Sequence, residues 1–200
     1  MNKPFSQACE NNKTAILTIL KKALSSVTRL LEIGSGTGQH AVFMATHLPQ
    51  ITWQTSDLLD NHFGINQWLD EFPNHNLRKP IELDINADWN LPEPLRPLNG
   101  IFTANTLHIL SWQLVVKFFQ GVTENLQKEG VLCIYGPFNY QGKYTSESNE
   151  NFDVWLKERD SNSAIRDFEA IVSLATSSGL TLTADHDMPA NNRLLVLVKT

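Results

Sequence analysis

The sequence predicts a single α/β domain, residues 1–200, in which helices cover both faces of a mostly parallel sheet that ends in an antiparallel hairpin. Short apolar runs alternate with segments of helical periodicity, the order that produces parallel strands joined by right-handed crossovers. Residues 131–136, VLCIYG, form an apolar run that is typical of a strand buried on both faces. Residues 180–187 and 193–199 flank a PANN turn and predict the terminal hairpin.

A strand, a glycine turn and a helix are expected near the start of the chain. Residues 29–34 form a short apolar run that ends in glycine, and residues 38–48 have helical periodicity up to Pro49. Further strands are expected at 51–57, 81–85 and 100–105, and further helices at 14–24, 58–71, 111–126, 152–159 and 165–178. The polar segment before residue 14 is expected to be partly irregular, and residues 139–151 are expected to form a loop.

The charge and hydropathy of the chain argue against two classes of partner. The formal charge is -5 and no cluster of Lys and Arg stands out, so no nucleic-acid-binding surface is expected. No apolar run approaches the length of a membrane span. Residues 1–13 lack the apolar core of a secretory signal, which favours a cytoplasmic protein, and a monomer is the default expectation.

The two cysteines predict neither a disulfide framework nor a metal site. Cys9 and Cys133 are isolated in the sequence, and Cys133 lies inside an apolar run. Both are expected to be reduced, and no metal is expected.

The turn after the first expected strand reads EIGSGTG, with Glu32, Gly34, Gly36 and Gly38 at every second position. Glycine permits positive φ and lets the backbone approach a ligand closely. The G-x-G-x-G spacing differs from the G-x-G-x-x-G of dinucleotide sites, and Glu32 would repel a phosphate at the helix N-terminus. This carboxylate suits a cationic ligand instead, such as an ammonium or a sulfonium.

Asp57 lies at the end of the second expected strand, where it can accept hydrogen bonds from both hydroxyls of a ribose. Together with Glu32 it indicates a nucleoside that carries a positive charge and no phosphate, which describes S-adenosylmethionine. A nicotinamide oxidoreductase is disfavoured, because it would need a dinucleotide site.

The pattern Glu-x-Gly-x-Gly-x-Gly followed by a strand-ending acid resembles the class I S-adenosylmethionine-dependent methyltransferases over nearly the whole chain. Four blocks resemble more narrowly the family of domain of unknown function 938, the methyltransferase-like 26 group: FSQACENNKTAIL, LEIGSGTGQHA, YGPFNYQGKYTSESNENFD and MPANN. The resemblance implies a Rossmann-like, seven-stranded sheet and the transfer of a methyl group. It does not imply a particular acceptor, because the substrate of the family is not established. Residues 161–169, SNSAIRDFE, depart from the family pattern, in which a tryptophan and a glycine precede Ile-Arg-Asp.

The resemblance also implies roles for individual residues. It places Glu32 near the methionine ammonium, Asp57 on the ribose hydroxyls, and Leu58 against the adenine ring. Asp84, with the backbone N–H of Ile85, would bind the adenine amino group. The cofactor-binding residues that it implies are Glu32, Gly34, Ser35, Gly36, Gly38, Asp57, Leu58, Asp84, Ile85 and Asn105.

Two residues after the fourth expected strand are the catalytic candidates. Asn105 would lie beside the methyl group, and His108 would border the acceptor, where a histidine can act as a general base. His108 could instead be a packing or hydrogen-bonding residue. Asp84 could simply cap the turn into NADWN, and the glycine-rich turn could be only a tight turn.

A small molecule is the favoured acceptor. The ANTLHI sequence lacks the Asn/Asp-Pro-Pro-aromatic motif usual in enzymes of this fold that methylate nucleic-acid amino groups. A protein side chain is the second candidate, and a noncatalytic cofactor-binding or partner-binding module is the alternative to an enzyme. Two segments could close over the site: residues 1–24, as an N-terminal helical lid, and 139–151, whose Tyr140 and Tyr144 could contact an acceptor. Residues 10–12, ENN, could equally cap the first helix.

Overall fold

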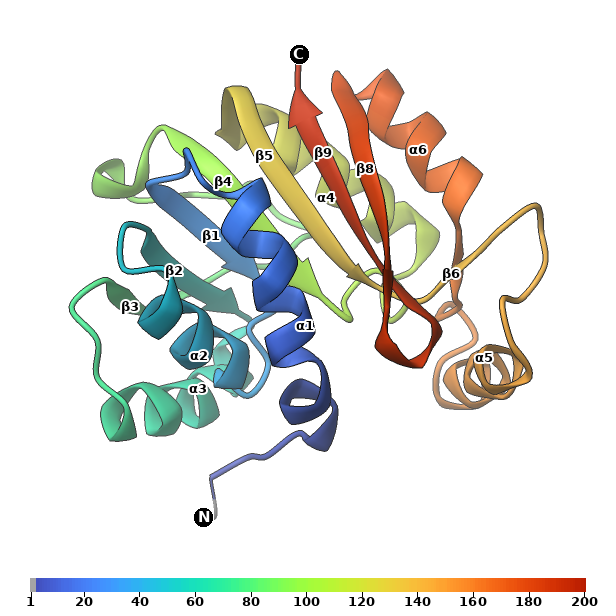
Figure 1. The fold of residues 1–200 in the computed structure, drawn as a ribbon, viewed down its shortest axis with the longest axis horizontal. Coiled ribbons are helices and arrows are strands. Elements are labelled where there is room, and N and C mark those ends of the chain that lie inside the picture. Colours follow the sequence, from blue (N-terminus) through green and yellow to red (C-terminus); the bar gives the residue numbers. More distant parts are fainter. Residues whose placement is uncertain (1–2) are drawn as a thin grey trace.

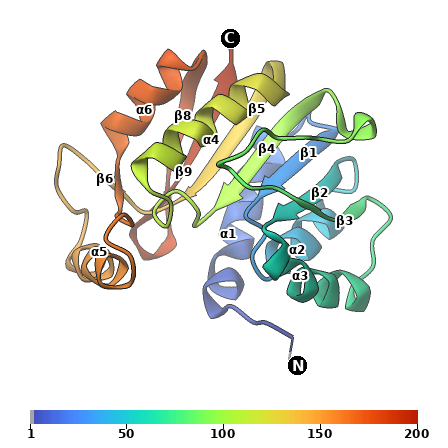
Figure 2. The same ribbon diagram turned by 180° about the vertical axis from the view of Figure 1, so that it is seen from behind.

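The computed structural model describes residues 3–200, which form a seven-stranded sheet with helices on both faces (Figures 1 and 2). Residues 1 and 2, part of the expected domain and lid, lie outside the described residues. The strands of the sheet are β1 Arg29–Ile33, β2 Thr52–Asp57, β3 Leu77–Glu82, β4 Leu98–Ala104, β5 Leu126–Gly136, β8 Leu180–Met188 and β9 Asn192–Lys199. The helices are α1 Gln7–Ala23, α2 Gln39–His47, α3 Leu59–Glu71, α4 Trp112–Asn125, α5 Glu147–Arg159 and α6 Phe168–Ser177.

The strand order in the sheet is β3-β2-β1-β4-β5-β9-β8. The pairs from β3 to β5 are parallel, whereas β9 pairs antiparallel with both β5 and β8. The predicted mostly parallel sheet with a C-terminal antiparallel hairpin is therefore confirmed. The strand order reverses between β1 and β4, and ligands bind beyond the strand ends at such a switch point. These ends lie at the lower edge of the sheet in Figure 1, next to α5 and the start of α1.

Two apolar cores lie on opposite faces of the sheet. Helices α1, α2 and α3 cover one face, and α4 and α6 cover the other (Figures 1 and 2). Strand β5 contributes Cys133 and Tyr135 to the first core and Leu132 and Ile134 to the second. Because successive side chains of a strand point to opposite faces, its apolar run serves both cores.

Helix α1 begins at Gln7 rather than at residue 14. Ser6 caps it, since the Ser6 hydroxyl accepts a hydrogen bond from the Cys9 N–H at 3.3 Å. The polar segment expected to be partly irregular is therefore helical from Gln7. The alternative in which residues 10–12 cap the helix is wrong, because they lie inside it.

The third strand lies at Leu77–Glu82, and its prediction at 81–85 is wrong in position. The apolar pattern of IELDI suggested the later position. The actual strand, LRKPIE, is at the edge of the sheet, where polar side chains and Pro80 are tolerated because one side of the strand is unpaired.

The expected loop at 139–151 contains more regular structure than its polarity suggested. Helix α5 begins at Glu147, where the Ser146 hydroxyl accepts a hydrogen bond from the Asn149 N–H at 3.1 Å. Two further short strands, β6 (Phe138–Asn139) and β7 (Arg166–Asp167), form a separate parallel pair. This pair joins the start of the loop to the segment before α6.

Candidate functional site

The glycine turn joins β1 to α2 at the switch point of the sheet. Its three glycines have positive φ: 70° at Gly34, 58° at Gly36 and 88° at Gly38. A Cβ on Gly34 would lie 2.9 Å from Thr106 Oγ1, and a Cβ on Gly38 would lie 3.2 Å from Ile65 Cα. Gly36 differs, because the nearest atom to its Cβ would be 4.0 Å away. Packing explains two of the glycines, while Gly36 borders space that a ligand can fill.

Asp57 ends β2 and faces this turn. Its Oδ2 accepts a hydrogen bond from the Gly36 N–H at 2.7 Å. Its Oδ1 accepts from the Leu58 N–H at 2.8 Å and from Asn61 Nδ2 at 2.7 Å. A carboxylate offers about four acceptor positions, so Asp57 can still accept a hydrogen bond from a ligand. The neighbouring Leu58 side chain is 52% exposed and free to cover such a ligand.

Glu32 lies buried beneath the turn. Its Oε2 accepts hydrogen bonds from Trp53 Nε1 and from the Ser35 hydroxyl, both at 3.0 Å. Burial raises the pKa of Glu32 to about 7, against the lowering effect of the two hydrogen bonds. The carboxyl group therefore changes its ionisation near neutral pH. Trp53 gave no sign of this role in the sequence, where it read as one residue of an apolar strand.

Asp84 and Ile85 lie beyond the end of β3, on the turn that follows it. The Asp84 side chain is exposed, and its Oδ1 accepts a hydrogen bond from the Asn86 N–H at 2.8 Å. The sequence placed Asp84 inside the third strand. In the structure it lies outside that strand, which ends at Glu82. Its hydrogen bond is the turn-capping interaction that the sequence offered as an alternative.

Asn105 and His108 follow β4. Asn105 has a φ of 59°, and its N–H donates to the Tyr135 carbonyl at 2.8 Å. The His108 ring is buried and meets Phe152 edge-on, with 5.3 Å between ring centroids. Burial, and to a smaller extent the charge of Arg166, lowers the pKa of His108 to about 4, so the ring is neutral at pH 7. Within residues 3–200, neither the Asn105 carboxamide nor the His108 ring nitrogens make a hydrogen bond.

Arg166 holds the loop that carries His108. Its buried guanidinium donates to the carbonyls of Leu107 and Asn162, both at 3.0 Å, and to that of Leu110. Three backbone carbonyls thus converge on one cation, which fixes the loop on either side of His108. The sequence gave no sign of this role, because the contacts join segments far apart in the chain.

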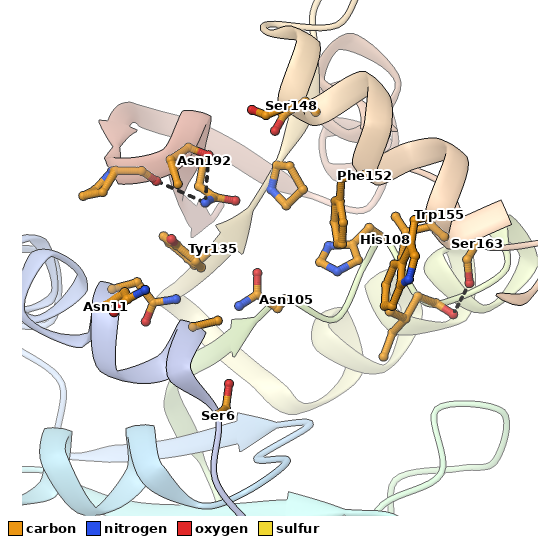
Figure 3. Close-up of a pocket in the computed structure, with 18 of the residues that line it drawn as sticks. Ser6, Asn11, Asn105, His108, Tyr135, Ser148, Phe152, Trp155, Ser163 and Asn192 are labelled. Carbon is orange, nitrogen blue, oxygen red and sulfur yellow. Dashed lines mark hydrogen bonds between the residues drawn. The ribbon is translucent and has the colours of Figure 1, made fainter. Parts of the chain in front are cut away.

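A cavity of about 880 Å³ opens beside Asn105 and His108 (Figure 3). It lies between α1 and α5, over the ends of β4 and β5. Its lining includes Asn11, Asn105, His108, Tyr135, Phe152 and Trp155. Glu32, Asp57 and Asp84 do not line it. The expected site residues therefore fall into three groups, one around the glycine turn, one in this cavity, and Asp84 with Ile85 on the turn after β3.

The first turn of α2 holds the N-terminal segment in place. Gln39 Oε1 accepts from the Ser6 N–H at 2.6 Å, and its Nε2 donates to Glu10 Oε1 at 2.8 Å. His40 Nε2 lies 2.7 Å from Asn12 Oδ1, and both side chains are buried. The start of α1 is thus attached directly to the end of the glycine turn. Neither Gln39 nor Asn12 was expected to take part.

Tyr140 and Tyr144, expected to contact an acceptor, do not line the cavity. The Tyr140 hydroxyl donates to Asp185 Oδ2 and the Tyr144 hydroxyl donates to Asp153 Oδ2, each at 2.8 Å. These hydrogen bonds attach the 139–151 segment to β8 and α5.

None of the helices in residues 3–200 has both the length and the apolar character to cross a membrane. No group of three or more His, Cys, Asp or Glu side chains in this range could hold a metal ion.

Solved structures with the same fold include methyltransferases. An O-methyltransferase family protein from Burkholderia thailandensis has a TM-score of 0.81 at 12% identity, over 94% of this chain and 56% of its own. Human N-acetylserotonin methyltransferase, in complex with S-adenosylmethionine, has a TM-score of 0.80 at 15% identity, and the match covers 96% of this chain and 53% of the human protein. An O-methyltransferase family 2 protein from Planctomyces limnophilus, in complex with apigenin, has a TM-score of 0.81 at 16% identity, and the match covers 95% of this chain and 57% of that protein. The chain spans a little over half the length of each, and at these identities the likeness concerns the fold.

The family described as "Protein of unknown function (DUF938)" matches residues 3–199, almost the whole chain. The narrower resemblance seen in the sequence is thereby confirmed. This chain, with the fold of the class I methyltransferases, belongs to the DUF938 family.

Proposed function

We propose that the protein transfers a methyl group from S-adenosylmethionine to a small-molecule acceptor. The observation that carries the proposal is the Asp57 carboxylate, which is hydrogen-bonded to the Gly36 N–H of the glycine turn and can still accept from a ribose hydroxyl. The fold supports it, since human N-acetylserotonin methyltransferase is in complex with S-adenosylmethionine and the Planctomyces limnophilus protein with apigenin, a small molecule.

The residues around the glycine turn fit this cofactor. Gly36 leaves space where the ribose would approach the backbone. Asp57 would hold the ribose hydroxyls, Leu58 would cover the adenine ring, and Glu32 would attract the methionine ammonium from beneath the turn. The full set proposed to bind the cofactor is Glu32, Gly34, Ser35, Gly36, Gly38, Asp57, Leu58, Asp84, Ile85 and Asn105.

The residues of the cavity would position the acceptor and take up its proton. When bound, the cofactor supplies a methyl group on a sulfonium, which needs no further activation. His108 is unprotonated at pH 7 and would accept the proton that the acceptor loses, as a weak base because burial and Arg166 disfavour its charged form, and Asn105 would orient the reacting atom. Helices α1 and α5 border the cavity and would exclude water from it. Positioning of this kind supplies up to about 7–11 kcal/mol of a barrier.

Replacing Asp57 with alanine should weaken cofactor binding. Loss of charge-assisted hydrogen bonds worth about 1.5–3 kcal/mol raises the Kd for S-adenosylhomocysteine roughly 10- to 100-fold. Isothermal titration calorimetry measures this change, with Asp60→Ala as the matched control, because Asp60 is exposed on α3. The proposal fails if wild-type protein binds neither cofactor nor product, or if Asp57→Ala binds as tightly as Asp60→Ala. Thermal unfolding of both variants checks that the fold is kept.

Cofactor binding should release a proton near neutral pH. The pKa of Glu32 is raised to about 7, and an ammonium bound beside it would lower that pKa again by favouring the charged form. Affinity for S-adenosylhomocysteine should therefore fall as the pH drops below 7, by up to about tenfold per pH unit. Calorimetry in buffers of different ionisation enthalpy detects the proton.

Two controls separate Glu32 from other titrating groups. Glu32→Gln should abolish the proton release. 5′-Methylthioadenosine, which lacks the amino acid part, should bind without it even to wild-type protein. An identical pH dependence for both ligands would show that Glu32 does not face the ammonium.

Replacing His108 with glutamine should slow methyl transfer and leave cofactor binding intact. Loss of a general base lowers kcat about 10²- to 10⁴-fold. Transfer of labelled methyl groups from S-adenosylmethionine into a small-molecule extract measures the rate, and calorimetry measures cofactor affinity. Equal label transfer by the variant would assign His108 to packing against Phe152. Absence of transfer by the wild-type protein, despite cofactor binding, would favour a noncatalytic binding module.

A further inference from the structure

The charged side chains that line the cavity lie at its rim. Among the described lining residues these are Arg159 and Asp160, both exposed at the end of α5. His108 is neutral at pH 7, and burial raises the pKa of Tyr135, which keeps its hydroxyl neutral as well. A charged ligand group at the inner end of the cavity, beside His108 and Asn105, would lose its water without gaining an opposite charge. This inner end therefore favours an uncharged part of the acceptor.

One wall of the cavity is aromatic. Phe152 and Trp155 lie one turn apart on α5, with their ring planes 18° apart and their centroids separated by 5.6 Å. Figure 3 shows both rings on the same side of the cavity as His108. The Arg159 guanidinium lies over the Trp155 ring, 4.6 Å from its centroid, and Trp155 is still 45% exposed, which leaves apolar surface that a ligand would cover. Such a wall suits the flat face of a ring, which aromatic side chains prefer to stack against.

The opposite wall is polar. Asn11 of α1 and Tyr135 of β5 lie across from the aromatic rings, and Asn105 lies between the two walls (Figure 3). The Asn105 carboxamide, without a hydrogen bond in residues 3–200, offers both a donor and an acceptor. Its backbone holds a positive φ of 59°, a conformation that is strained for most residues and is common at functional sites. One unsatisfied amide is thus held where the edge of a stacked ring would reach it.

We propose that the methyl acceptor is a planar ring compound that packs its face on Phe152 and Trp155 and directs an uncharged edge, which bears the methylated atom, toward Asn105. This inference rests on the function proposed above for the same site. The cavity volume of about 880 Å³ lies within the range of about 300–1,000 Å³ typical of small-molecule pockets.

Calorimetric titration of the protein saturated with S-adenosylhomocysteine tests the inference with two probes. 2-Naphthol is planar, and decahydro-2-naphthol has the same ring skeleton and hydroxyl group but is not planar. We expect 2-naphthol to bind, and decahydro-2-naphthol to bind at least about tenfold more weakly. If decahydro-2-naphthol binds as tightly as 2-naphthol, or if neither probe binds, the acceptor class is wrong.

Variants of the aromatic wall show where the probe binds. Trp155→Leu and Phe152→Leu should each weaken 2-naphthol binding about tenfold and leave S-adenosylhomocysteine affinity unchanged. Trp112→Leu is the matched control, because Trp112 is similarly exposed, at 39%, and does not line the cavity. Unchanged 2-naphthol binding in Trp155→Leu and Phe152→Leu would contradict the inference. Failure of S-adenosylhomocysteine itself to bind would instead refute the proposed function.

Discussion

The hydrogen bond from the Gly36 N–H to the Asp57 carboxylate, 2.7 Å long, sets the geometry of the site. It ties the glycine turn to the end of β2, and a second bond, from the Ser35 N–H to the Ser56 carbonyl at 3.0 Å, reinforces it. The turn needs this attachment because its glycines adopt positive φ and have no side chains to pack. Helix α2 starts directly after the turn, and its Gln39 holds the start of α1. The position of the N-terminal segment thus follows from that of the turn.

The two halves of the site meet at Thr106. This residue packs against Gly34 of the turn, and its hydroxyl accepts a hydrogen bond from Thr103 at 2.7 Å. Thr106 directly follows Asn105, so the separation between the glycine turn and the floor of the cavity is set by packed atoms. Arg166 fixes the other end of the same loop. The loop therefore sets how far a cofactor on the turn would lie from an acceptor in the cavity, and in-line transfer requires that the acceptor atom reach the methyl group directly.

The fold and the position of the glycine turn were predictable because their signals are local. The glycine turn and Asp57 directly follow or end short strands, and the resemblance to the methyltransferases then gave these residues and Glu32 their expected roles. The edge strand β3 was misplaced because its exposed polar residues and Pro80 resemble a loop, and only its position in the sheet makes it a strand. Arg166 and Gln39 were missed for a related reason. Each acts through contacts with distant segments, which leave no pattern in the sequence.

A crystal structure of the protein with S-adenosylhomocysteine tests the central claim most directly. The account predicts density for the ribose within hydrogen-bond distance of the Asp57 carboxylate, with the amino group toward Glu32 and the sulfur facing the cavity beside Asn105. Density for the ligand elsewhere, or a glycine turn left empty at saturating concentration, would contradict it, and Asp57 would then serve only to brace the turn.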